Sequence, residues 1–347
     1  MRFMLSFIIP CYNVEKYIQQ CLDSIFACDL SENEYEVLCY DDCSTDGTIT
    51  ILENVVRFRN NVRIFCGSKN AGPGKGRNEC LRVARGKYVW FVDADDTIVS
   101  NKVKELVEQA DSNELDVLAF NYEDLDESRA VLNRPRVFGN TKVLDGLCFV
   151  EELFGDSIVF HMGYLVRFLC RRDFLLGKQI CFPEGVCYGE DTVVMLKVLF
   201  YSSRVRSIDC IAYQYWHHES STCGKFDNEY PARMIYERCI VTSIQLLSFS
   251  DEMDNMALIN DGIVYEKYSR LIRQYTHSHY LWMLPVYVFR TTKLERTKVF
   301  ELMKEHGSEV KLLKKEMNLL ERVLLLPIIG PIMAEIMSFV YQVKHGK

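Results

Sequence analysis

The chain has 347 residues, of which 48% are hydrophobic and 26% are charged, and its formal net charge is −7. So large an apolar fraction excludes a disordered chain, and the length suggests about two domains. The acidic balance argues against a general nucleic-acid-binding protein, which needs a basic surface to neutralise phosphates. The 14 cysteines form no CxxC pair, so we expect reduced thiols in the cytoplasm and not a disulfide framework.

The amino-terminal stretch MRFMLSFIIP raises the question of a signal peptide. It lacks a small-residue cleavage site and continues directly into polar residues, so we predict a buried first strand over residues 3–9, ended by Pro10. No run of about 20 uninterrupted apolar residues is present, and no ordinary membrane span is therefore predicted.

Strands and helices alternate in the first hundred residues. Further strands are predicted at 35–40, 62–66 and 88–92, and helices at 14–26, 48–59 and from the end of a glycine-rich loop to residue 84. This order indicates an α/β open sheet with parallel neighbours, which binds ligands outside the carboxyl ends of its strands. Polar residues follow three of the four strands: Tyr12-Asn13, Asp41-Asp42 and Asp93 to Asp96.

The glycine-rich loop Gly72-Pro73-Gly74-Lys75-Gly76 matches neither GxGxxG nor GxxxxGK[ST]. The sequence therefore gives only a weak signal for a dinucleotide dehydrogenase or a P-loop ATPase. Two interpretations remain open. Lys75 and Arg77 could contact a diphosphate, or the loop simply connects a strand to a helix.

Three carboxylates, Asp93, Asp95 and Asp96, follow the fourth predicted strand. They repel one another unless a cation or hydrogen-bond donors compensate, and Mg²⁺ or Mn²⁺ takes such oxygen ligands together with substrate phosphates. The alternative is that Asp95 or Asp96 caps a helix beginning near Asn101. One carboxylate suffices for a cap, so we favour the metal.

Two further groups of residues could carry chemistry. Glu190-Asp191 stands at the start of a predicted helix, where an ionised carboxylate could remove a proton from a hydroxyl or could simply cap the helix. His217 and His218 could bind a metal or a phosphate, but adjacent residues on a strand point to opposite faces. We therefore expect at most one of these histidines to face a given site.

The order of motifs resembles the start of a family 2 glycosyltransferase of the GT-A fold. The resemblance covers roughly residues 3 to 225. The motifs that carry it are Ser6 to Asn13, Asp41 to Thr48, Asn70-Ala71-Gly72, Gly76-Arg77-Asn78, Ala84 to Tyr88, Phe91 to Asp96 and Gly189-Glu190-Asp191.

The resemblance implies an inverting transferase that uses a nucleotide-diphospho-sugar, most simply a UDP-sugar, and Mn²⁺ or Mg²⁺. Asp191 would be the general base, with Glu190 beside it, and Asp93-Ala94-Asp95 fills the DxD motif, so Asp93, Asp95 and Asp96 would serve the metal. The donor nucleotide would be held by Pro10, Tyr12, Asn13, Asp42, Asn70, Gly72, Arg77 and Asp93.

The chain departs from the family at Trp216, where members often place an arginine near the diphosphate. Lys75, His217, His218 or Arg77 would then have to support the diphosphate or metal. Two other functions stay open. One is a catalytically silent nucleotide-sugar-binding or scaffold protein, and the other is a nucleotidyltransferase, which shares an α/β nucleotide site with paired aspartates.

The predicted domains are a catalytic domain over residues 1–225 and a mostly helical region over 226–347. From Lys311 onward the chain has six Lys or Arg and three Asp or Glu, a net charge of +3 around a proline-broken apolar segment. This tail would either lie on an anionic inner-membrane surface or pack against the core or in a homodimer. We expect a cytoplasmic protein that adds a sugar to a surface glycan or lipid-linked glycan.

Overall fold

The computed structural model describes residues 3–135, 137–154, 165–184, 189–218, 240–257 and 262–276, together with positions 297 and 301. The chain forms two compact units. The first contains residues 1–155 and 160–218, and the second contains residues 156–159 and 219–347. The predicted boundary at residue 225 lies outside the described residues, and the division into functional domains stays a prediction.

The first unit is built on one mixed sheet, which has nine strands in the part of the chain described above. Along the sheet the strands follow the order β3-β2-β1-β4-β8-β6-β9-β5, and β7 pairs with β6. Their bounds are β1 Leu5–Cys11, β2 Tyr35–Asp41, β3 Val62–Cys66, β4 Tyr88–Phe91, β5 Thr97–Ile98, β6 Val117–Leu125, β7 Val131–Asn133, β8 Phe168–Arg171 and β9 Val205–Trp216.

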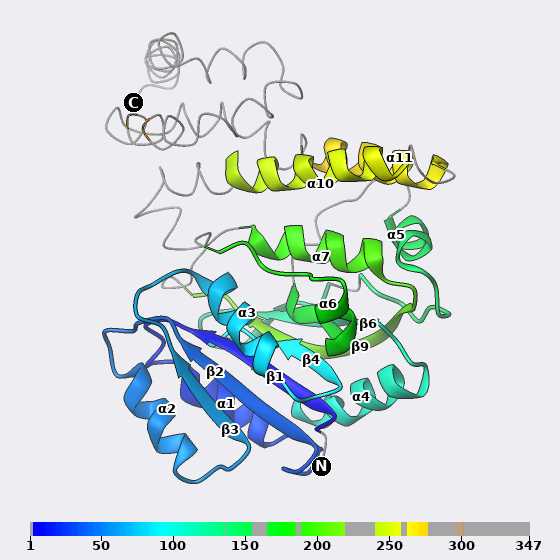
Figure 1. Cartoon of the computed structure of the whole chain (residues 1–347). Helices are drawn as coiled ribbons and strands as arrows, with labels where there is room; N and C mark the ends of the chain where they lie inside the picture. Colours follow the sequence, from blue (N-terminus) through cyan, green and yellow to red (C-terminus); the bar gives the residue numbers. More distant parts are fainter. Residues whose placement is uncertain are drawn as a thin grey trace, which may run out of the picture. The chain divides into compact units, whose positions relative to one another are not determined.

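The predicted α/β architecture is confirmed, because the first four strands run parallel and helices separate them along the chain (Figure 1). The helices of this unit are α1 Ile18–Phe26, α2 Thr48–Val56, α3 Pro73–Val83, η1 Ser100–Lys102, α4 Val103–Ser112, α5 Gly146–Phe154, η2 Leu165–Arg167, α6 Arg172–Gly177 and α7 Glu190–Tyr201.

Both faces of the central strands are covered. On one face Phe7 and Val37 belong to an apolar cluster with residues of α1, α2 and α4. On the other face α3 packs so closely that a Cβ at Gly76 would stand 2.8 Å from the Tyr40 ring. Burial on both sides explains why these strands read as continuous apolar runs in the sequence.

The carboxyl ends of six described strands meet at one edge of the sheet. β1, β2, β3 and β4 are mutually parallel, and β8 runs antiparallel to both β4 and β6, so β6 has the direction of β4. β9 is parallel to β6. The residues that follow these six strands are therefore brought to the same edge, where open α/β sheets bind ligands.

The prediction of a loop over Gly72–Gly76 is wrong beyond its first residue, because α3 begins at Pro73. Proline suits the first position of a helix, where its missing N–H leaves no hydrogen bond unmade. The glycines that suggested a loop serve close packing instead, since a Cβ at Gly74 would stand 2.4 Å from the Pro183 carbonyl oxygen. This packing sets α3 against the segment that precedes α7.

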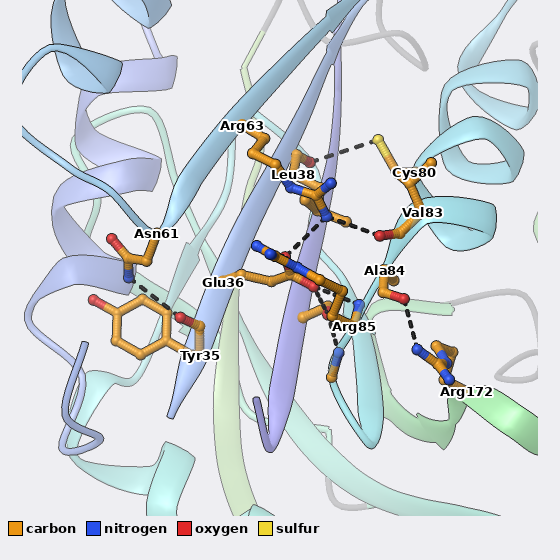
Figure 2. A network of polar contacts seen from close by, with 12 residues as sticks. Tyr35, Glu36, Leu38, Asn61, Arg63, Cys80, Val83, Ala84, Arg85 and Arg172 are labelled. Atoms are coloured by element: carbon orange, nitrogen blue, oxygen red, sulfur yellow. Dashed lines mark hydrogen bonds and ion pairs between the residues drawn. The ribbon is translucent and has the colours of Figure 1, made fainter. Parts of the chain in front are cut away.

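At the opposite edge of the sheet a fully buried carboxylate joins four chain segments (Figure 2). Glu36 accepts hydrogen bonds from Ser6 Oγ at 2.7 Å, Arg63 Nη2 at 2.9 Å and both the backbone N and Nε of Arg85. Ser6 Oγ in turn accepts from Gly86 N at 2.9 Å. A buried charge needs such partners, and here they tie β1 and β2 to β3 and the α3–β4 loop.

In the second unit, the described residues form two helices, α10 Thr242–Ala257 and α11 Ile263–Thr276. They pack on each other, and Ser250 Oγ lies 2.8 Å from Ser269 Oγ. For these two segments, this agrees with the mostly helical region predicted over 226–347. No described helix is both long and apolar enough to cross a membrane. The basic tail from Lys311 lies outside the described residues.

We expect Glu36→Gln to lower the free energy of unfolding by about 3 kcal/mol, because it leaves the Arg63 and Arg85 charges without their shared carboxylate. Glu53→Gln, an exposed position on α2, is the matched control and should change it by less than about 0.5 kcal/mol. Urea unfolding followed by circular dichroism measures both. Equal stability of the two variants would contradict the role given to Glu36.

Candidate active site

The centre of the site is one arginine surrounded by three carboxylates. Arg77 lies on α3, and its Nη1 donates to Glu190 Oε1 at 2.8 Å and to Asp191 Oδ1 at 2.9 Å. Its Nη2 donates to Asp93 Oδ1 at 2.9 Å. The Arg77 side chain is only 4% exposed, while Asp191 is 21% and Asp93 31% exposed. The two acidic motifs predicted from the sequence are therefore brought together by Arg77.

The three carboxylates are not fully balanced by one positive charge. Burial raises the pKa of Asp191 well above its usual range, and attraction to Arg77 offsets this only in part because Glu190 and Asp93 repel its negative charge. Burial likewise raises the pKa of Glu190 and of Asp93. The pKa of Arg77 is raised, because its three carboxylates outweigh the effect of its own burial. The cluster therefore has a net negative charge when all its groups are ionised.

Helix capping does not explain these acidic residues. α7 begins at Glu190, its N-cap is Gly189, and no side chain caps it. α4 begins at Val103 with Lys102 as N-cap, again without a side-chain cap. Glu190, Asp191, Asp95 and Asp96 thus have other partners, and the alternative of simple caps is excluded.

Asp96 has a positioning role in the structure. It is 1% exposed, and its oxygens accept hydrogen bonds from Tyr213 Oη at 2.6 Å and Trp216 N at 2.8 Å. Tyr213 Oη also accepts from Asp93 N at 3.2 Å. Burial raises the pKa of Asp96 well above its usual range, with further contributions from Asp95 and Asp93. This network fixes the segment after β4 against β9.

Asp95 contacts a histidine that lies 123 residues further along the chain. Its Oδ2 lies 3.1 Å from His218 Nε2. The His218 ring stacks on Trp216 at 4.4 Å, and the Tyr17 ring lies 4.7 Å from it. Within the described residues no group of three or more His, Cys, Asp or Glu side chains is arranged to hold a metal ion. Asp95 and His218 nonetheless present one oxygen and one nitrogen donor side by side.

Asp42 holds a loop at the end of β2. Its carboxylate is 3% exposed and accepts from Ala71 N at 3.0 Å and Gly72 N at 2.8 Å. Burial raises its pKa, and these two N–H groups counteract the rise. Gly72 N also lies 3.3 Å from the Oδ1 of the exposed Asn70. Three of the residues predicted to bind the nucleotide are thus in direct contact.

At the end of β1, Tyr12 is 46% exposed and Pro10 is half-buried. Asn13 accepts from Thr45 N at 2.8 Å and donates its own N to Ser44 Oγ at 3.0 Å, so it braces the turn after β2. Asn13 and Cys43 both have left-handed backbone, with φ of 51° and 65°. Only Tyr12 therefore offers a largely open surface at this end of β1.

Two of the residues predicted to support a diphosphate have other contacts in the structure. Lys75 pairs with Glu79 at 2.8 Å and with Glu184 at 3.4 Å. His217 Nε2 lies 2.8 Å from Asp124 Oδ1, and the side chain is 53% exposed. The two adjacent histidines contact different carboxylates, but they follow β9, which ends at Trp216, and so do not lie on a strand as predicted.

Sequence reasoning missed several residues that shape the site. It assigned Arg77 to the diphosphate, while its carboxylate partners and the role of Tyr213 depend on contacts between distant parts of the chain. Asn78 was noted only as part of a motif, although its side chain binds both the N and the O of Phe182. Arg129 belongs to none of the sequence motifs, yet its guanidinium lies 3.9 Å from the centre of the Trp216 ring. None of these contacts has a local sequence signal.

The profile of the family described as Glycosyl transferase family 2 matches residues 6–175. This segment is a member of glycosyl transferase family 2. The uncharacterized glycosyltransferase EpsJ of Bacillus subtilis (strain 168) is 28% identical over 218 residues, 63% of this chain and 62% of EpsJ. The poly(ribitol-phosphate) beta-N-acetylglucosaminyltransferase TarS of Staphylococcus aureus (strain MW2) is 30% identical over 218 residues, 60% of this chain and 35% of TarS. The aligned part thus spans less than two thirds of either relative.

Solved structures show the same fold. The crystal structure of S. aureus TarS 1-349 in complex with UDP-GlcNAc matches with a TM-score of 0.67 and 23% identity, over 100% of this chain and 93% of that chain. The mannosyltransferase PcManGT from Pyrobaculum calidifontis, in complex with GDP-Man and Mn²⁺, matches with a TM-score of 0.50 and 16% identity, over 98% of this chain and 88% of that chain. The GT-A fold predicted from the sequence motifs is confirmed.

We expect Arg77→Met to lower the free energy of unfolding by about 3–5 kcal/mol, because it leaves three carboxylates without their shared cation. Arg82→Met, on the same helix but 52% exposed, is the control and should cost less than about 1 kcal/mol. Urea unfolding at pH 7 measures both.

The same variant makes a second measurement possible. Without Arg77, burial and mutual repulsion would raise the carboxylate pKa values further above those of the unfolded chain. The folded state then binds protons more tightly, so Arg77→Met should regain stability relative to the parent protein as the pH falls from 7 to 5. A pH-independent difference between the two proteins would contradict this account.

Proposed function

We propose that this protein is an inverting glycosyltransferase that moves a sugar from a nucleotide-diphospho-sugar, most simply a UDP-sugar, to a hydroxyl group of a surface glycan. The observation that carries the proposal is the arrangement around Arg77. It holds Asp191, a partly exposed carboxylate, next to Asp93 at the carboxyl edge of the sheet. A base and a donor-binding edge in such proximity are what group transfer requires.

The donor nucleotide would lie over the ends of β1 and β2. Tyr12 offers an exposed ring against which a base can stack, and Asp42 has acceptor capacity beyond the two N–H groups it already binds. The family relatives support a nucleotide-sugar donor, since TarS was crystallised with UDP-GlcNAc. The name of TarS, a poly(ribitol-phosphate) beta-N-acetylglucosaminyltransferase, also supports an acceptor hydroxyl on a polymer.

Asp191 would accept the proton of the acceptor hydroxyl as that oxygen attacks the anomeric carbon. The new carbon–oxygen bond forms as the bond to the diphosphate oxygen breaks, and the leaving diphosphate takes the electron pair. Attack from the face opposite the leaving group inverts the configuration in a single displacement. Glu190 and Arg77 would keep Asp191 in place during this step.

A divalent ion fits one part of this site. Asp95 and His218 lie within 3.1 Å of each other, and Mg²⁺ or Mn²⁺ often takes only one or two protein ligands, with water and substrate phosphates completing the set. Asp93 would add an oxygen, since only its Oδ1 is committed to Arg77. Both oxygens of Asp96 already accept hydrogen bonds, so its contribution would be to position Asp95. A bound ion would neutralise charge on the diphosphate.

The first experiment is a donor panel. Purified protein is incubated with UDP- and GDP-sugars, with and without Mn²⁺, and the small-molecule product is identified. We expect slow release of a nucleoside diphosphate from one donor class. Release of pyrophosphate would indicate a nucleotidyltransferase instead. Thermal stabilisation by a donor without any turnover, even with acceptor glycans, would indicate a silent binding protein.

We expect Asp191→Asn to lower kcat by about 10²- to 10⁴-fold, because the amide cannot accept the acceptor proton. Affinity for UDP should stay within about twofold, because the amide oxygen can still accept from Arg77. Asp23→Asn, an exposed position on α1, is the control and should leave both quantities unchanged. Normal turnover in Asp191→Asn would refute its assignment as the base.

The pH dependence gives a further prediction. Burial raises the pKa of Asp191, and the base works only when ionised, so kcat/KM should fall on the acidic side at a pH above that expected for an ordinary aspartate. Glu190→Gln removes a repelling charge and should move this limb to lower pH. An identical acidic limb in both proteins would contradict the coupling.

A further inference from the structure

A nucleotide-sugar donor brings a diphosphate that needs positive charge, but the cations predicted to supply it already contact carboxylates. Arg77 contacts Asp93, Glu190 and Asp191, and Lys75 pairs with Glu79 and Glu184. His217 and His218 each lie within hydrogen-bond distance of an aspartate. A cation outside these predicted residues is therefore needed to bind the diphosphate.

Arg129 lies in the tight turn between β6 and β7, beyond the carboxyl end of β6. The turn is closed by Asp126 N donating to Ala130 O at 2.9 Å and Arg129 N donating to Asp126 O at 2.8 Å. The Asp126 carboxylate accepts from Ser128 Oγ at 2.6 Å and Ala130 N at 2.9 Å. Arg129 itself has left-handed backbone with φ of 64°. The turn thus holds Arg129 in one defined conformation.

The guanidinium of Arg129 is fixed against the site by Trp216. Its Cζ lies 3.9 Å from the centre of the Trp216 ring, a cation–π contact. The same tryptophan donates its Nε1 to Asp126 O at 2.8 Å and its backbone N to Asp96 Oδ1 at 2.8 Å. Trp216 therefore links the turn to the segment Asp93 to Asp96 and holds the Arg129 charge near that segment.

The guanidinium of Arg129 has the properties expected of a group that binds an anion. Burial lowers the pKa of Arg129, and attraction to Asp96 and Asp95 only partly offsets this. Its Nη1 is buried and has no hydrogen-bond partner among the described residues. Among the described residues Arg129 forms no ion pair with Asp95 or Asp96, whereas Arg77 forms three ion pairs.

We propose that Arg129 binds the diphosphate of the nucleotide-sugar donor and neutralises the charge that develops on it as the sugar leaves. The inference rests on the proposed function. It assigns to Arg129 the diphosphate contact for which family members often have an arginine at the position of Trp216. A guanidinium offers paired donors that match phosphate oxygens, and its stacking on an indole fixes its plane before the donor arrives. Trp216 is then the positioning residue for Arg129.

Binding measurements on three variants test this proposal. Arg129→Asn removes the charge while keeping a residue that tolerates left-handed backbone, and Arg129→Lys keeps the charge without the paired donors. Arg57→Asn, at an exposed position after α2, is the control. Each protein is titrated with UDP by calorimetry and with uridine by competition, in the presence of Mn²⁺.

We expect Arg129→Asn to weaken UDP binding about ten- to hundredfold and to change uridine binding by less than twofold. Arg129→Lys should lie between it and the parent protein, and Arg57→Asn should match the parent. Equal UDP affinity in Arg129→Asn, or equal losses for UDP and uridine, would overturn the inference while leaving the proposed function intact. If the parent protein does not bind UDP, the same variants are titrated with GDP and guanosine, with the same expected results. A parent protein that binds neither diphosphate overturns the proposed function, and the inference with it.

Discussion

The geometry of the site depends on the contact of one buried guanidinium with three carboxylates. Arg77 joins Asp93, 16 residues away in the sequence, to Glu190 and Asp191, more than 110 residues away. It fixes their positions, but a single positive charge cannot satisfy three negative ones at low exposure. This imbalance would suit the role proposed for Asp191 as catalytic base, since burial raises its pKa and so gives it an affinity for a proton that an exposed aspartate lacks.

The two edges of the sheet differ in their roles: one stabilises the fold and the other carries the candidate active site. At one edge Glu36 binds groups from β1, β3 and the α3–β4 loop, and its side chain is fully buried. At the other edge several side chains stay partly open: Tyr12 and Asp93 follow β1 and β4, and Asp191 lies in the first turn of α7. The first edge holds the strands in register, so the second can carry repelling charges without loss of the fold.

The sequence predicts local features well and distant pairings poorly. β1, β2 and β4 were found because burial on both faces leaves apolar runs, and the Asp93 to Asp96 motif because it follows such a strand. β3 is only partly buried but still has a short apolar pattern. The start of α3 was missed, since its glycines suggest a loop when the Tyr40 ring and the Pro183 carbonyl that require them are not yet known. β8 has only four residues and pairs with strands far away in the chain. Arg129 lies in a turn whose residues match no motif, and its contact with Trp216, which places it near the site, is visible only in the folded structure.

The left-handed backbone at Asn13, Cys43 and Arg129 has a consequence for protein engineering. One route to greater thermostability is to replace such residues with glycine, which relieves a steric cost of about 1 kcal/mol at each position. Here that route would remove the side chain that braces the β2 turn at Asn13 and the cation beside the DxD segment at Arg129. A more heat-resistant form of this protein should therefore be sought at the Glu36 edge or on the exposed faces of the helices, where greater rigidity does not compete with the proposed binding of a donor.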